Sequence, residues 1–137
     1  MISLGEAKKA TNEAQCAFVH YFMTEHTVPN FSSFGYDMTE LELLSGIVGS
    51  QSAYQELVGA DSPQGIAAGE SILMIEENIR STQDSMLSAL KENGYGEQYM
   101  EELKHLLGKW LEAVRQEQGI SYRLDPRLEE YGLREKI

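Results

Sequence analysis

Apolar residues recur along this chain at steps of three and four positions, the period of α-helices that bury one face. No stretch alternates apolar and polar residues as a half-buried β-strand does. The pattern predicts four long helices, over about residues 4–26, 37–58, 63–93 and 97–118. The positions predicted to face the core in the first, third and fourth helices are Leu4, Ala7, Thr11, Ala14, Phe18, Tyr21, Ile72, Ile75, Ile79, Thr82, Met86, Ala89, Met100, Leu103, Leu107, Trp110 and Val114.

Helix start signals support two of these boundaries. Asp37 or Thr39 can cap the second helix, because their side-chain oxygens accept hydrogen bonds from the free N–H groups of a first turn. Residues 61–63 (Asp-Ser-Pro) open the third helix, since proline in the first turn loses no hydrogen bond. Residues 27–36 contain proline, glycine and serines, and are predicted to form a loop.

Glycines mark the expected helix ends. Gly59, Gly94 and Gly119 follow the last apolar positions of the second, third and fourth helices, where glycine readily adopts the left-handed conformation. After Gly119 we expect an extended stretch over residues 120–124 and a short helix to about Arg134.

Together these elements predict an all-α fold, an antiparallel four-helix bundle with a short C-terminal helix or strap. The bundle domain is expected to cover residues 1–119, and residues 120–137 to form an arm that packs on it. In the alternative, the arm docks onto a partner, and Tyr131 is then a candidate contact.

The second helix contains two glycines, Gly46 and Gly49, in a stretch of small residues. A glycine within a helix costs about 1 kcal/mol relative to alanine, so the missing side chains must bring a compensating gain. Close approach of a neighbouring helix is one explanation. A kink, or a ligand against bare backbone, is the other.

The composition is that of an ordinary globular protein, with 42% apolar and 24% charged residues. The N-terminus lacks a basic region followed by an apolar run, and no stretch approaches the roughly 18 apolar residues of a membrane span. The single Cys16 excludes an intramolecular disulfide and is predicted to be a small core residue. We therefore expect a cytoplasmic protein that does not enter a membrane.

Charge is distributed unevenly. The formal net charge is −11, and no Lys or Arg occurs between residues 10 and 79, whereas residues 80–137 are close to balanced. The acidic residues of the first range are Glu13, Glu25, Asp37, Glu40, Glu42, Glu56, Asp61, Glu70, Glu76 and Glu77. Such a field repels nucleic acid, so no direct nucleic-acid binding is expected, and it can attract a protein with a basic surface. There are two alternatives. The negative field either only keeps the protein soluble, or imitates nucleic acid and so inhibits a DNA-binding protein.

Three of the carboxylates form a stripe. Glu70, Glu77 and Asp84 are seven residues apart, so they share a face of the third helix, and Ile72 and Ile79 in the core seam turn that face outward. Exposed carboxylates do not acquire the separated pKa values that an acid–base pair needs. The stripe is therefore a candidate partner-binding surface, and a solvated ridge is the alternative.

A metal centre is not expected. Glu102 and His105 have the Glu-x-x-His spacing of carboxylate-bridged di-iron bundles, which need this pair twice. No second pair occurs, so we expect neither a metal nor another cofactor.

The segment His105-Leu106-Leu107-Gly108-Lys109 is similar to the phosphate-accepting region of histidine phosphotransfer domains. That resemblance implies that His105 would accept a phosphoryl group, that lysine would steady its charge and that glycine would admit a receiver domain. The family places lysine three and glycine four residues after the histidine, whereas Gly108 and Lys109 have the reverse order.

Val19 and Met23 lie outside the predicted core face of the first helix, and their burial against a second copy predicts a homodimer. With no catalytic residues emerging, we do not expect an enzyme. The sequence favours a small acidic protein that binds a macromolecular partner, as an adaptor, an inhibitor or an assembly subunit. A phosphotransfer protein or enzyme that uses His105 is the alternative.

Overall fold

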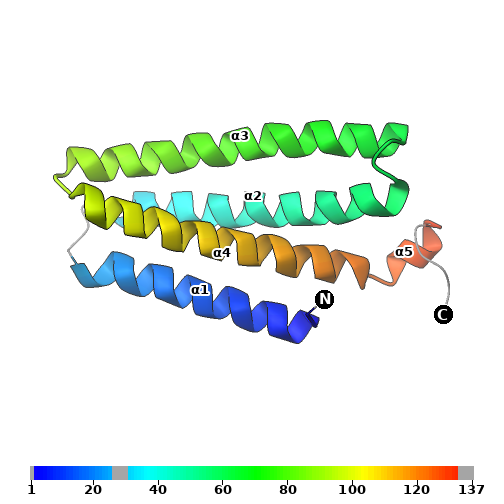
Figure 1. Cartoon of the computed structure of the whole chain (residues 1–137), viewed down its shortest axis with the longest axis horizontal. Helices are drawn as coiled ribbons and strands as arrows, with labels where there is room; N and C mark the ends of the chain where they lie inside the picture. Colours follow the sequence, from blue (N-terminus) through cyan, green and yellow to red (C-terminus); the bar gives the residue numbers. More distant parts are fainter. Residues whose placement is uncertain (1, 26–30, 133–137) are drawn as a thin grey trace.

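The computed structural model describes residues 2–25 and 31–132, and these form four long helices and one short one (Figure 1). The helices are α1 (Leu4–Glu25), α2 (Phe31–Val58), α3 (Pro63–Glu92), α4 (Glu97–Arg123) and α5 (Arg127–Glu130). No strand occurs within the described ranges, and successive long helices alternate in direction (Figure 1). The predicted all-α, antiparallel helical bundle is confirmed.

The bundle is organised around α2 and α4, which run in the same direction and lie side by side (Figure 1). Helix α3 packs along α2, and α1 packs along α4, whereas α3 and α4 meet at only a few positions. In a regular up-and-down bundle the helices that are neighbours in sequence form the main contacts. Here α1 and α3 lie at opposite edges instead, and each presents much of its surface to solvent.

Glycines allow this close approach of α2 and α4. A Cβ atom at Gly49 would overlap the backbone carbonyl of Arg115, and one at Gly46 would lie 3.2 Å from Cγ of Gln118. On the other side of the contact, a Cβ at Gly119 would lie 3.3 Å from the carbonyl oxygen of Gly49. Of the two explanations for the glycines of α2, close helix packing is the one observed.

The core contains an aromatic stack shared by α1 and α4. The ring of Phe18 lies 5.9 Å from that of Phe22 and 5.7 Å from that of Trp110, between centroids. All three side chains are almost completely buried. The buried cluster around them comprises Leu41, Val48, Ile79, Met86, Leu90, Leu103, Leu107, Leu111 and Val114. The apolar inner positions predicted for α3 and α4 are therefore at the core or packed against it.

The boundaries of α3 are as predicted. Ser62 caps its N-terminus, because Oγ accepts a hydrogen bond of 3.0 Å from the N–H of Gly65, and Pro63 is the first helical residue. At the other end the helix stops at Glu92, and Gly94 has a φ of +87°, the left-handed conformation expected there.

The prediction for the start of α2 was wrong. Residues 31–36 belong to the helix, so neither Asp37 nor Thr39 is its cap. Glycine and serine lower helix propensity by at most about 1 kcal/mol each, and packing of the following turns against α3 and α4 outweighs this. The remainder of the expected loop, residues 27–30, lies outside the described residues.

The prediction that α4 ends at Gly119 was also wrong, since the helix continues through the expected extended stretch to Arg123. Gly119 lies against Gly49 and Ile120 is buried, so packing on α2 holds this part of α4 helical. Helix α5 follows and ends at Glu130, earlier than expected, while residues 133–137 lie outside the described part. Leu128 of α5 is buried.

Cys16 is exposed, contrary to its predicted place in the core. It precedes the buried Phe18 by two residues, which corresponds to about 200° around the helix axis. Its side chain therefore projects from the outer face of α1.

Candidate functional site

The six residues predicted to contact a partner lie on three separate surfaces. Glu70, Glu77 and Asp84 are exposed on α3. Val19 and Met23 are exposed on α1, at the opposite edge of the bundle (Figure 1), and Tyr131 is exposed beyond α5. The structure places the three carboxylates on one helix face, as predicted. It does not bring the surfaces on α3, on α1 and at Tyr131 together.

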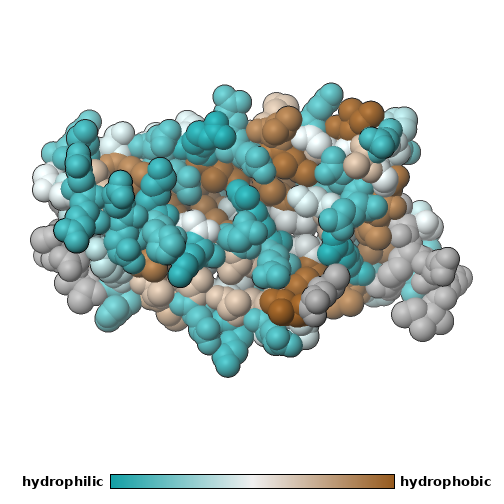
Figure 2. All heavy atoms as spheres, in the orientation of Figure 1, coloured by the Kyte–Doolittle hydropathy of each residue, from teal (hydrophilic) through white to brown (hydrophobic). Residues whose placement is uncertain are grey.

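Apolar side chains accompany the carboxylates on α3. Leu73 is 67% exposed, Met74 is 70% exposed, and Ile66 is also more than half exposed. We call Ile66, Glu70, Leu73, Met74 and Glu77 the α3 ridge. Their spacing of three and four residues makes them neighbours on the helix surface, and Figure 2 shows hydrophobic residues between hydrophilic ones along this edge.

The apolar members of this ridge were not predicted as site residues. Leu73 and Met74 stand between the inward-facing Ile72 and Ile75, so the helical period alone turns them toward solvent. The sequence did contain a signal for this surface, namely two large apolar residues at positions that the helical period turns outward.

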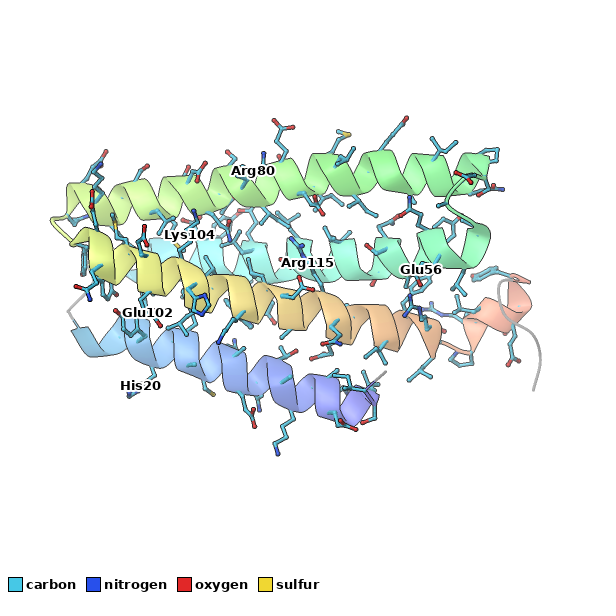
Figure 3. All side chains as sticks on the ribbon, in the orientation of Figure 1. His20, Glu56, Arg80, Glu102, Lys104 and Arg115 are labelled. Carbon is cyan, nitrogen blue, oxygen red and sulfur yellow. The ribbon has the colours of Figure 1, made fainter. Side chains whose placement is uncertain are left out.

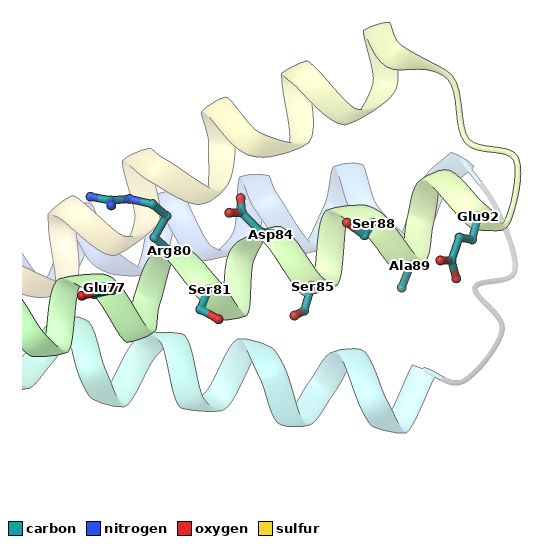
Figure 4. Close-up of a pocket in the computed structure, with 8 residues that line it drawn as sticks. All are labelled: Glu77, Arg80, Ser81, Asp84, Ser85, Ser88, Ala89 and Glu92. Atoms are coloured by element: carbon teal, nitrogen blue, oxygen red, sulfur yellow. The ribbon is translucent and has the colours of Figure 1, made fainter.

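Beyond the ridge, the outer face of α3 becomes polar. A shallow hollow of about 590 Å³ lies on this face, and its lining residues all come from α3 (Figure 4). Arg80 follows Glu77 by three residues and precedes Asp84 by four, so a positive charge lies within the acidic stripe. Three serines line the hollow, namely Ser81, Ser85 and Ser88. The side chains that could engage an apolar partner are therefore confined to the N-terminal half of α3.

The cleft between α3 and α4 is lined by polar and apolar groups in similar measure, with residues of α2 contributing to it, and has a volume of about 440 Å³. Arg115 (labelled in Figure 3) lines it, with its guanidinium 3.9 Å from the Glu112 carboxylate and its Nε buried without a hydrogen-bond partner. Arg123, at the end of the cleft, forms an ion pair with Glu56 of α2. These charges are balanced, which gives the cleft no preference for a ligand of either sign.

His105 lies on the exposed face of α4, as predicted. Lys104, Gly108 and Lys109 accompany it around a hollow of about 760 Å³. Nothing lies within 4 Å of a Cβ position at Gly108, so the backbone there is accessible. No group of three or more potential metal ligands occurs among the residues that the structure describes, Glu102 and His105 included.

Comparison of the chain with protein-family models, with curated proteins and with solved structures finds no significant match. Within the described ranges, no helix has the length and apolar character needed to cross a membrane.

Proposed function

We propose that this protein acts by binding a protein partner through the α3 ridge. The observation that carries the proposal is the exposure of Leu73 and Met74 between Glu70 and Glu77. Burying one such side chain against a partner contributes roughly 1.5–3 kcal/mol. A surface that only kept the protein soluble would gain nothing from two large apolar side chains in water.

The charge of the ridge defines the partner's chemistry. No Lys or Arg occurs between residues 10 and 79, so the carboxylates of the ridge favour a partner whose apolar contact surface is flanked by basic residues. The apolar residues also favour this role over imitation of nucleic acid, because a phosphate backbone offers a partner charge and no large apolar side chains.

Affinity capture from extracts of the source cell tests the proposal. Wild-type protein is compared with the double variant Leu73→Gln/Met74→Gln and with Ser81→Gln, a matched change at an exposed position of the same helix. We expect a basic partner that wild type and Ser81→Gln retain, that the double variant loses, and that raised salt weakens. Identical capture by wild type and the double variant would contradict the proposal.

A second candidate function is phosphoryl transfer at His105, which is favoured by the accessible backbone at Gly108 and by the two adjacent lysines. An imidazole nitrogen of His105 would attack the phosphorus of an acyl phosphate. The N–P bond forms, the P–O bond to the carboxylate breaks, and the imidazole proton passes to water. Incubation with acetyl phosphate should then give an acid-labile label that His105→Gln abolishes and His20→Gln retains. A wild-type protein that remains unlabelled by acetyl phosphate and by receiver domains rules this function out.

We further propose that two copies associate through Val19 and Met23 of α1, since these apolar side chains are exposed on a helix whose main contact, within the described ranges, is with α4. The single cysteine suits a reducing compartment, and we infer a cytoplasmic location from it.

A further inference from the structure

A groove lined by apolar and uncharged polar side chains and one carboxylate runs between α2 and α4, on a different face of α2 from the one that packs on α3. It has a volume of about 630 Å³. Its lining residues are Thr39, Glu42, Leu43, Gly46, Ile47, Ser50, Gln51, Val114 and Gln118. Leu43 is 63% exposed and Ile47 is also exposed, although both border a concave surface rather than a convex one.

Helical spacing explains the shape of the groove. Thr39, Gly46 and Ser50 are small or short and follow one another along the lining face of α2. The exposed Leu43 and Ile47, four residues apart, form a ridge on α2, and the buried Val114 and the partly exposed Gln118, also four apart, line the groove from α4. A channel between two helices lined in this way has the form that accepts the side chains of a further helix.

The charge around the groove selects among the possible occupants. Glu42 lines it, and Gln118 on the α4 side donates a hydrogen bond of 3.4 Å to the Glu117 carboxylate. No lysine or arginine is among the lining residues, and α2 contains none. The apolar side chains of the groove, with the Glu42 carboxylate beside them, fit an apolar helix face flanked by positive charge. A second copy of this chain, whose net charge is −11, fits them poorly.

We infer that this groove is a second docking site, which binds an amphipathic helix whose apolar side chains are flanked by Lys or Arg. The inference rests on the proposed function, that of a protein that binds basic partners, and adds to it a separate surface and the form of its ligand. Leu43 and Ile47 contact the apolar face of the bound helix, and Glu42 faces its basic flank. The groove is distinct from the α3 ridge, so both surfaces can be occupied together.

A defined peptide tests the inference. The probe is a fluorescent helix of about 18 residues, or five turns, with leucine at positions spaced three and four apart and lysine elsewhere. One control peptide replaces lysine with glutamate, and another has the same composition in an order that leaves no apolar face. Binding to the full-length protein is measured by fluorescence anisotropy.

Four variants locate the binding. Leu43→Gln replaces an apolar lining side chain with a polar one, and Ser50→Trp fills part of the groove while adding apolar surface. Leu73→Gln on the α3 ridge and Ser81→Trp on the exposed face of α3 are the matched controls. Because Leu43, Leu73 and Ser81 are exposed and Ser50 borders the groove, the variants are expected to fold, which their melting curves check.

We expect the leucine–lysine peptide to bind the wild-type protein and both control peptides to bind it weakly. Leu43→Gln and Ser50→Trp should each weaken binding of the leucine–lysine peptide about tenfold or more, as loss of one buried aliphatic contact implies. The two α3 variants should bind as wild type does. If Leu73→Gln loses peptide binding and Leu43→Gln does not, the groove is not the docking site, and the α3 ridge is the surface that binds the peptide. Three other outcomes would overturn the inference: equal binding of all three peptides, equal effects of all four variants, or no binding by the wild-type protein. The proposed function is tested separately, by affinity capture with the variants of the α3 ridge.

Discussion

Gly49 of α2 lies directly against the backbone carbonyl of Arg115 in α4, where a single added methyl group would overlap the carbonyl oxygen. The contact joins two backbones, so neither side can yield by a change of rotamer. It fixes how closely α2 approaches α4. The position of α2 also determines where the groove between these helices opens and where α3 lies.

Replacement of Gly49 by alanine should therefore destabilise the protein. Alanine gains about 1 kcal/mol of helix propensity, but overpacking against a rigid backbone costs typically 1–3 kcal/mol and occasionally more. We expect a net loss in the free energy of unfolding, measured in urea through the fluorescence of the buried Trp110, the only tryptophan. Gly108→Ala is the matched control, because open space surrounds that position, and it should stabilise by up to about 1 kcal/mol. Two variants of equal stability would show that the contact at Gly49 does not constrain the fold.

The cap of α3 gives a second prediction. Oγ of Ser62 accepts the N–H of Gly65 and donates to the carbonyl oxygen of Gly59 at 2.7 Å, so it fixes both the helix and the preceding turn. Ser62→Ala should lower the free energy of unfolding by about 1 kcal/mol. Ser85→Ala, at an exposed position within the same helix, should leave it unchanged or slightly raised. A Ser62→Ala protein as stable as Ser85→Ala would mean that the cap contributes nothing.

Metal removal should leave the protein unchanged. Glu102 and His105 are exposed and have no further ligand within the part of the chain that the structure describes. Treatment with a chelator is expected to alter neither the melting temperature nor the helical circular dichroism spectrum. Stoichiometric iron, manganese or zinc in the purified protein, with a lower melting temperature after its removal, would refute this.

Sequence periodicity predicted the apolar core faces of α3 and α4 but not all helix ends. Gly94 and Gly119 follow apolar segments in the same way, yet Gly94 ends α3 with a positive φ, whereas Gly119 lies inside α4. The difference arises from Gly49, which packs against Gly119 and is 70 residues away in the chain. A helix-end signal that depends on a distant contact cannot be read from local sequence.

The candidate surfaces also differ in whether local sequence predicts them. The carboxylates of the α3 ridge follow from a seven-residue spacing, because that face is decided within one helix. The groove beside Leu43 and Ile47 depends on which helices are neighbours. An ordinary up-and-down bundle places α1 and α3 beside α2, whereas here the main contacts of α2 are with α3 and α4. The apolar residues of α2 were visible in the sequence, but the surface they form was not.

Self-association through α1 is the remaining prediction. Val19 is 36% exposed and Met23 is 52% exposed on a helix whose main contact is with α4. Burial of each side chain in a dimer would contribute roughly 1.5–3 kcal/mol. Repulsion between two chains of net charge −11 opposes this, but salt screens it over about 8 Å at physiological ionic strength. We therefore expect a dimer at micromolar concentration, more stable at physiological than at low salt.

Light scattering coupled to size exclusion measures the mass directly. Val19→Glu should shift the protein to its monomer mass of 15.4 kDa, because it places a charge within the apolar contact. Ala17→Glu adds the same charge at an exposed position of α1 that lies two residues, or about 200°, from Val19, and it should leave the dimer intact. A wild-type protein that elutes at the monomer mass excludes the dimer. If Val19→Glu does not disrupt the dimer, the interface lies on another face. The same mass measurement on Leu43→Gln and Leu73→Gln then decides between the groove on α2 and the α3 ridge.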